Sequence, residues 1–244
     1  MEFAALRDEM VASLEHETKA VVESTETARA MRAVPRHEFV DAEHRAYTDQ
    51  SFERLGTRVL SPSAVGLLVE ALAPKPGDDV LVVGAGVGYT AAVIAEIVGG
   101  EHVHALDIDR RIVYEARGNL ADAGYDDVLV DCQDGARGLP EYAPFDRVLV
   151  EAGAVRSPEA LVDQLTPGGR LVFPKGASSQ RLVAVEDGGV VAAYADVTFA
   201  PLLVDGEQAS AVERNRTVRE DREHAVRAAE SRRGWEHEWI DWDG

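Results

Sequence analysis

The sequence has little cysteine and no long apolar run. Cys132 is the one cysteine among 244 residues, which excludes an internal disulfide bond and favours a reducing compartment. No uninterrupted apolar stretch approaches the ~18 residues that a membrane-spanning helix needs, and the residues after Met1 show no secretory signal pattern. We therefore expect a cytoplasmic protein that does not enter a membrane.

Lysine is almost absent. It occurs only at positions 19, 75 and 175, and the formal net charge is −19. A nucleic-acid partner is disfavoured, because phosphate binding needs a basic surface. An acidic, lysine-poor surface suits a high-salt cytoplasm, so we hypothesise a halophilic protein; an ordinary acidic protein is the alternative. The histidines show no metal-ligand spacing, so we expect no metal site.

The most informative segment present is an apolar run at 80–83 followed by Gly84, Gly86 and Gly88. Helix-forming residues at 90–95 and a second apolar run ending in Asp107 come next. The order predicts a strand, a tight turn, a helix, a strand and a carboxylate, which together form a nucleoside-binding βαβ unit. Asp107 then accepts both ribose hydroxyls. The alternative is that the glycines serve only the geometry of the turn.

The glycine spacing distinguishes between nucleoside cofactors. A dinucleotide site needs a third glycine where Tyr89 stands, so NAD and FAD are disfavoured and S-adenosylmethionine is favoured. This cofactor has no phosphate, and its methionine portion must lie close to the turn. Asp109 is the competing carboxylate, and it is placed to cap a helix that starts at Arg110.

Hydrophobic periodicity and turn residues predict the order of the elements. Residues 1–33 are predicted to be helical, 41–60 irregular, and a helix begins at Ser61 and Pro62. Further along, we expect strands at 79–83, 102–107, 128–131, 145–151 and 170–173, helices at 89–98, 110–123 and 158–165, and a hairpin of 182–186 with 190–197.

This alternation predicts an α/β fold with a doubly wound, mostly parallel seven-stranded sheet and an antiparallel edge. We expect a helical, substrate-side extension at 1–76, a cofactor-binding Rossmann-like domain at 77–204 and a charged helical tail at 205–244. Ligands of such sheets bind beyond the carboxyl ends of the central strands.

Several motifs resemble those of the protein-L-isoaspartate O-methyltransferases, which have the class I S-adenosylmethionine-dependent methyltransferase fold. The resemblance spans about residues 10–208. It is carried by Val34-Pro35-Arg36-His37-Glu38-Phe39-Val40, Ala46-Tyr47-Thr48-Asp49, Ser61-Pro62, Cys132-Gln133-Asp134-Gly135, the block 143–174 and Phe199-Ala200-Pro201-Leu202.

The resemblance implies methyl transfer from S-adenosylmethionine to the free carboxylate of L-isoaspartyl residues in damaged proteins or peptides, a repair reaction. It makes Ser61 the catalytic residue, which orients the substrate carboxylate; a plain helix cap is the alternative. It implies a cofactor site made of Gly84, Ala85, Gly86, Gly88, Asp107, Ile108, Asp134, Gly135 and Gln208. Asp134 would bind the adenine amino group; an Asx turn is the alternative.

The chain departs from the family pattern in the altered stretch 51–61 and at two single positions. Val82 stands where the family usually has an acid, and Glu151 stands where a small or hydroxylated residue is typical. A carboxylate at 151 is expected to repel an anionic substrate. The alternatives are therefore a divergent methyltransferase of another substrate, or a catalytically inactive cofactor-binding regulatory protein.

Overall fold

The structure, a computed structural model, describes residues 2–41 and 45–203. Gln208 and the expected charged tail at 205–244 lie outside these residues. The family resemblance predicts a cofactor contact for Gln208, and this stays a prediction.

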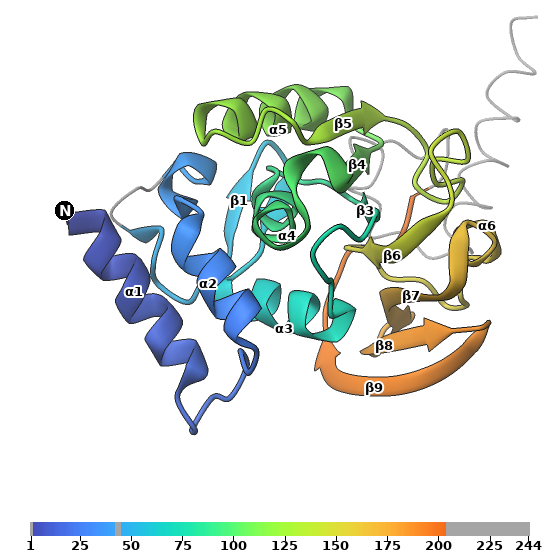
Figure 1. Cartoon of the computed structure of the whole chain (residues 1–244), viewed down its shortest axis with the longest axis horizontal. Helices are drawn as coiled ribbons and strands as arrows, with labels where there is room; N and C mark the ends of the chain where they lie inside the picture. The colour runs from blue at the N-terminus through green and yellow to red at the C-terminus, as the bar shows by residue number, and fades with distance from the viewer. Residues whose placement is uncertain (1, 42–44, 204–244) are drawn as a thin grey trace, which may run out of the picture. The chain divides into compact units, whose positions relative to one another are not determined.

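Within the described residues, seven strands form one sheet in the order β5-β4-β3-β6-β7-β8-β9 (Figure 1). The strands are β3 Val80–Val83, β4 Val103–Asp107, β5 Leu129–Cys132, β6 Phe145–Val150, β7 Leu165–Gly176, β8 Gln180–Glu186 and β9 Gly189–Val197. In this order, each pair of neighbouring strands from β5 through β4, β3 and β6 to β7 is parallel. Strand β8 is antiparallel to both β7 and β9. The expected mostly parallel sheet with an antiparallel hairpin edge is confirmed.

Both faces of the central strand β3 are buried, so its alternate residues enter different clusters. Val80 and Val82 pack with the helices α3 Pro62–Leu72, α4 Tyr89–Val98 and α5 Arg110–Asp122. Leu81 and Val83 enter a smaller cluster on the other face with Leu161 of α6 Glu159–Val162. Burial on both faces explains why β3 is an unbroken apolar run instead of an alternating one.

The N-terminal segment packs onto the sheet domain. It holds α1 Glu2–Glu15, α2 Thr25–Ala33 and the short helix η1 Arg36–Phe39, while η3 Gly100–His102 precedes β4. Figure 1 shows α2 between α1 and the helices α3 and α4. Leu14 and Met31 belong to the same buried cluster as Ile94 of α4. Among the described residues, no helix has both the length and the apolar character to cross a bilayer.

The helix expected over 1–33 is interrupted between α1 and α2. Ser24 caps α2, because its Oγ accepts a hydrogen bond from the Thr27 N–H at 3.2 Å. Both the N–H and the hydroxyl of Ser24 also donate to Glu70 of α3, at 3.1 and 2.6 Å. The cap and its tertiary partner start a new helix here, so the single continuous helix is wrong.

The segment 41–60, expected to be irregular, contains a β-hairpin. Strand β1 Phe52–Arg54 pairs with β2 Thr57–Val59. Leu55 and Gly56 both have positive φ, at 52° and 81°. A two-residue turn of this kind matches the twist of a hairpin, and Gly56 is the signal that indicates it in the sequence.

The helix expected over 158–165 is only Glu159–Val162, and the strand expected over 170–173 is longer than predicted. Leu165 already pairs with Phe145, and the ladder then shifts so that Arg170 pairs with Arg147. The Phe145 N–H donates to the Gln164 carbonyl at 2.8 Å. Pairing with β6 therefore begins early, and 166–169 forms an irregularity in the ladder.

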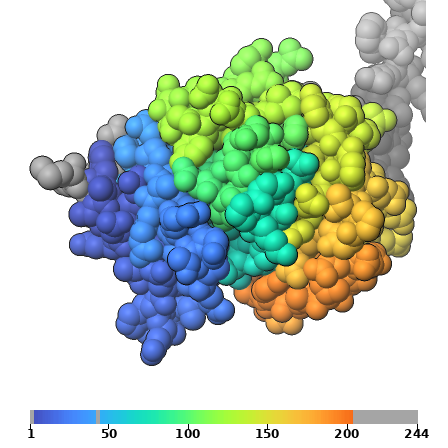
Figure 2. Space-filling model, in the orientation of Figure 1, coloured from blue at the N-terminus to red at the C-terminus, as the bar shows by residue number. Residues whose placement is uncertain are grey.

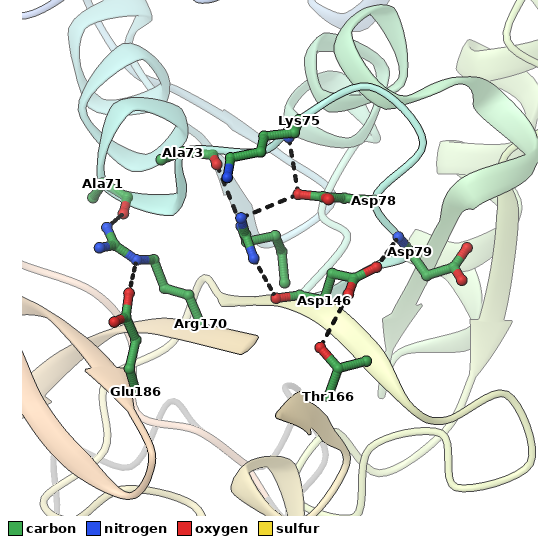
Figure 3. A network of polar contacts seen from close by, with 10 residues as sticks. Ala71, Ala73, Lys75, Asp78, Asp79, Asp146, Thr166, Arg170 and Glu186 are labelled. Carbon is green, nitrogen blue, oxygen red and sulfur yellow. Dashed lines mark hydrogen bonds and ion pairs between the residues drawn. The ribbon is translucent and has the colours of Figure 1, made fainter. Parts of the chain in front are cut away.

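Polar contacts fasten the edge of the sheet where β3 and β6 begin (Figure 3). Asp146 accepts from the Asp79 N–H and from the Thr166 hydroxyl, each at 3.0 Å. Arg170 bridges Glu186 and the Ala71 carbonyl, at 2.7 and 2.9 Å. These contacts tie the C-terminal end of α3 to the sheet, and so help to position Ser61 at the other end of that helix.

Candidate functional site

The turn after β3 presents its backbone at the carboxyl edge of the sheet. The N–H groups of Gly84 and Ala85 both donate to the Leu106 carbonyl at 2.8 Å. Gly84 and Gly86 are partly exposed, with φ of 89° and 51°, whereas Ala85 is buried. A Cβ added at Gly86 would meet no atom within 4 Å. The space in front of this turn is therefore open to a ligand.

Gly88 is glycine for a different reason. It is buried with φ of 93°, and an added Cβ would lie 3.0 Å from the Leu120 side chain of α5. This glycine lets α4 start close to α5. The role of Gly88 visible in the structure is therefore helix packing, and a cofactor contact there stays a prediction.

Asp107 joins the end of β4 to the glycine turn. Its Oδ2 accepts from the Gly86 N–H at 3.2 Å and its Oδ1 from the Asp109 N–H at 3.1 Å. Burial raises the pKa of Asp107, although these backbone donors oppose the shift. Asp109 caps α5 by accepting from the Arg111 N–H at 2.9 Å. Asp107 thus contacts the glycine turn, whereas Asp109 caps α5. The partly buried Ile108 lies between them in the sequence.

The loop after β5 lies beside the same edge. Asp134 Oδ1 accepts from the Ala136 N–H at 2.9 Å, which is the Asx turn weighed as the alternative for this residue. A Cβ on the buried Gly135 would lie 2.5 Å from Val83 Cγ1. Glycine is thus needed here so that the loop can approach β3.

These residues fit an adenosylmethionine-type ligand. The open backbone at Gly86 leaves room for a methionine portion, and the partly buried Asp107 supplies acceptors of the type that ribose hydroxyls use. Asp134 follows the next strand of the sheet, at the same edge. Within the described part of the chain, no group of three or more His, Cys, Asp and Glu residues is arranged to hold a metal.

Tyr89 fills the position of the missing third glycine and packs inward. Its ring lies 5.5 Å from that of Phe39, and the Arg36 guanidinium lies 4.6 Å above it. The buried Arg36 side chain also donates to the carbonyls of Ala46 and Leu60, at 2.8 and 2.6 Å. Arg36 therefore connects the residue before Ser61 to the first residue of α4, a link that sequence reasoning missed.

Ser61 caps α3 and also lines a cleft. Its Oγ accepts from the Ala64 N–H at 3.3 Å and lies 3.2 Å from Ser63 Oγ. The cleft has a volume of about 730 Å³ and runs between the loop after α1, the end of β2 and the end of β9. Figure 2 shows the blue N-terminal segment beside the orange hairpin segment on this face. The two interpretations of Ser61 are thus compatible.

Two cationic side chains line the cleft, Lys19 and Arg58, and Lys19 is one of the chain's three lysines. Asp49 holds Lys19 in place through a 2.8 Å ion pair and accepts from the Ser63 N–H at 2.9 Å. Burial acts to raise the pKa of Asp49, but the hydrogen bonds from Lys19 and Ser63 outweigh it and lower the pKa. Asp49 is therefore an ionised link between the loop after α1 and the first turn of α3.

Glu151 follows β6 and lies against the glycine turn. Its N–H donates to the Val83 carbonyl at 2.8 Å. Its Oε1 is buried without a hydrogen-bond partner, and burial raises the pKa of the carboxyl to about 8. In the free protein the group is therefore mostly uncharged at neutral pH. The repulsion of an anionic substrate expected from the sequence does not apply to this neutral form.

The sequence is similar to known proteins over most of its length. The family model for protein-L-isoaspartate(D-aspartate) O-methyltransferase matches residues 6–208. The chain is 42% identical over 180 residues to the protein-L-isoaspartate O-methyltransferase of Methanopyrus kandleri, covering 71% of this chain and 78% of that protein. It is 39% identical over 183 residues to the Methanosarcina mazei protein of the same name, covering 72% and 75%.

The fold is similar to that of a solved Plasmodium falciparum protein described as a protein-L-isoaspartate O-methyltransferase in complex with S-adenosyl-L-homocysteine. The TM-score is 0.71 at 21% identity, covering 81% of this chain and 98% of that one. At this identity, the likeness shows the fold alone.

Proposed function

Because the chain belongs to the protein-L-isoaspartate(D-aspartate) O-methyltransferase family, we propose that it transfers a methyl group from S-adenosylmethionine to the free carboxylate of L-isoaspartyl residues. The substrates are damaged proteins or peptides. Esterification lets the site re-form a succinimide and return partly to normal aspartate. The observation that carries the proposal is that the family match covers both the glycine turn and Ser61.

The cofactor would be held at the carboxyl edge of the sheet. The backbone at Gly84, Ala85 and Gly86 would face its methionine portion, and Asp107 would accept from its ribose hydroxyls. Asp134 would accept from the adenine amino group. When bound, S-adenosylmethionine supplies an electrophilic methyl group on a sulfonium.

The substrate side of the proposal uses the cleft that Ser61 lines. A carboxylate nucleophile is already ionised at neutral pH, so the protein needs no general base. The Ser61 hydroxyl would donate to this carboxylate and orient it, while Lys19 and Arg58 supply positive charge in the same cleft. The chain's contribution is then mostly alignment and exclusion of water.

The proposal is tested with paired synthetic peptides that differ only in an L-isoaspartyl or an L-aspartyl linkage. We expect base-labile methyl incorporation into the first peptide and at least about 100-fold less into the second. The assay should be run at low and high salt, because of the acidic surface. Equal methylation of both peptides, or of neither at any salt concentration, would contradict the proposed substrate.

Replacing Ser61 with alanine is expected to lower turnover about 10- to 100-fold and to leave the affinity for S-adenosylhomocysteine unchanged. The loss of the helix cap alone costs about 1 kcal/mol of stability. Ser61→Asp separates the two effects, since aspartate caps equally well but repels the substrate carboxylate. A Ser61→Asp variant with full activity would show that Ser61 serves only as a cap.

Two further proposals come from the sequence. We propose the division of the chain at residues 76/77 and 204/205, with the first segment on the substrate side. The location of Lys19, Arg58 and Ser61 around one cleft supports this role. A cytoplasmic location is proposed from the single cysteine.

A further inference from the structure

The feature that the proposed reaction leaves unexplained is the carboxyl group of Glu151. Its Oε1 is buried and has no hydrogen-bond partner within the described residues. An unpaired polar atom in this state costs about 1–3 kcal/mol, more when charged. Such an atom needs a partner, which water or a bound ligand can supply.

The surroundings of Glu151 show what kind of partner is missing. Burial raises the pKa of its carboxyl group, a hydrogen bond from the Thr90 hydroxyl of α4 lowers it, and the charge of Asp107 at the end of β4 raises it. Asp107 is an acid, so it makes ionisation of Glu151 harder. The third neighbour is the turn after β3, where a Cβ on Gly84 would lie 3.5 Å from Glu151 Cβ. Two acids thus flank an open glycine turn.

We propose that Glu151 accepts a hydrogen bond from the α-ammonium group of the cofactor's methionine portion. This inference rests on the proposed function, which brings adenosylmethionine to the turn. The cofactor carries two positive charges, but only the ammonium has N–H donors. The sulfonium has no hydrogen to donate, so it cannot form a hydrogen bond with Glu151 Oε1. The positive charge of the ammonium also stabilises the ionised Glu151 carboxylate, which the negative charge of Asp107 disfavours.

The pairing couples cofactor binding to a proton. Free Glu151 has a pKa of about 8 and is mostly protonated at pH 7. The ammonium favours the ionised carboxylate, so binding at pH 7 releases close to one proton from Glu151. The affinity for the cofactor therefore rises between pH 6 and 8. It stays constant at higher pH, where Glu151 is already ionised before binding. Burial also raises the pKa of Asp107, so Asp107 can release protons on binding as well. Comparing the wild type with a variant that changes Glu151 alone isolates the protons that Glu151 releases.

The test is calorimetric binding of S-adenosylhomocysteine and of 5′-methylthioadenosine, which lacks the ammonium and carboxylate of the methionine portion. Proton release is measured at pH 7 in buffers of different ionisation enthalpy. The proteins are the wild type, Glu151→Gln and the matched control Glu159→Gln, whose side chain is exposed on α6. Thermal unfolding confirms that each variant folds.

For S-adenosylhomocysteine, we expect Glu151→Gln to release about one proton less than the wild type and to bind about tenfold more weakly at pH 8. Binding of 5′-methylthioadenosine should change less than about twofold, and Glu159→Gln should match the wild type. Equal proton release in wild type and Glu151→Gln, or equal weakening of both nucleosides, overturns the inference and leaves the proposed function intact. Failure of wild-type protein to bind S-adenosylhomocysteine overturns the proposed function itself.

Discussion

An Asp107→Ala variant is expected to lose at least about 100-fold in affinity for S-adenosylhomocysteine, because two hydrogen bonds to a charged acceptor are worth about 3 kcal/mol or more together. The substitution removes the proposed ribose acceptors. It also releases the Gly86 and Asp109 N–H groups, which the carboxylate holds at 3.2 and 3.1 Å. Turn geometry and ligand contacts are therefore lost together. Calorimetric titration measures the effect.

The matched control for this variant is Asp109→Ala. Asp109 caps α5 and pairs with Arg111, so its loss should lower stability by about 1 kcal/mol without a comparable effect on binding. Urea unfolding of both variants separates the two effects. An Asp107→Ala protein that binds like the wild type, or an Asp109→Ala protein that binds equally poorly, would show that Asp107 does not have the assigned role.

The second large effect expected is on stability against pH in the absence of cofactor. Burial raises the pKa of Glu151 from 4.5 to about 8. A group whose pKa is raised by folding contributes stability below its unfolded pKa and loses it as pH rises through its folded pKa. For Glu151 this loss runs from about pH 4.5 to 8 and reaches up to about 5 kcal/mol.

Glu151→Gln removes this titration and keeps the shape of the side chain. Its stability relative to the wild type should therefore increase from pH 5 to pH 9, until the variant is the more stable protein. Urea unfolding at the two pH values measures the difference, with Glu159→Gln as the control that should show no such change. If the stability difference between wild type and Glu151→Gln were the same at pH 5 and pH 9, Glu151 would not titrate in the interior.

Much of the sheet could be predicted because its signals are local. Gly84 ends an apolar run, Asp109 begins a helix as its cap, and 187–189 separates two strand patterns. The predicted bounds were wrong where contacts between residues far apart in the sequence determine where an element begins. Ser24 starts α2 with help from Glu70, and Leu165 joins the sheet early because Phe145 pairs with it. The hairpin at 52–59 was missed although Gly56 indicates its turn.

The site divides in the same way. The glycine spacing and the acid at the end of the next strand indicate a nucleoside site from residue order alone. The different tasks of the glycines could not be predicted, since Gly86 faces open space, Gly88 packs on Leu120 and Gly135 packs on Val83. The link from Arg36 to Tyr89 and Leu60 also joins positions far apart in the chain.

By itself, the sequence determined the βαβ unit and the type of cofactor, because backbone geometry and charge spacing at neighbouring residues are local properties. Its motifs indicated the family by resemblance alone. Only the tertiary structure decided the protonation of Glu151. A carboxyl group is charged or neutral according to the solvent and the groups around it, and these come from β3, β4 and α4 only after folding.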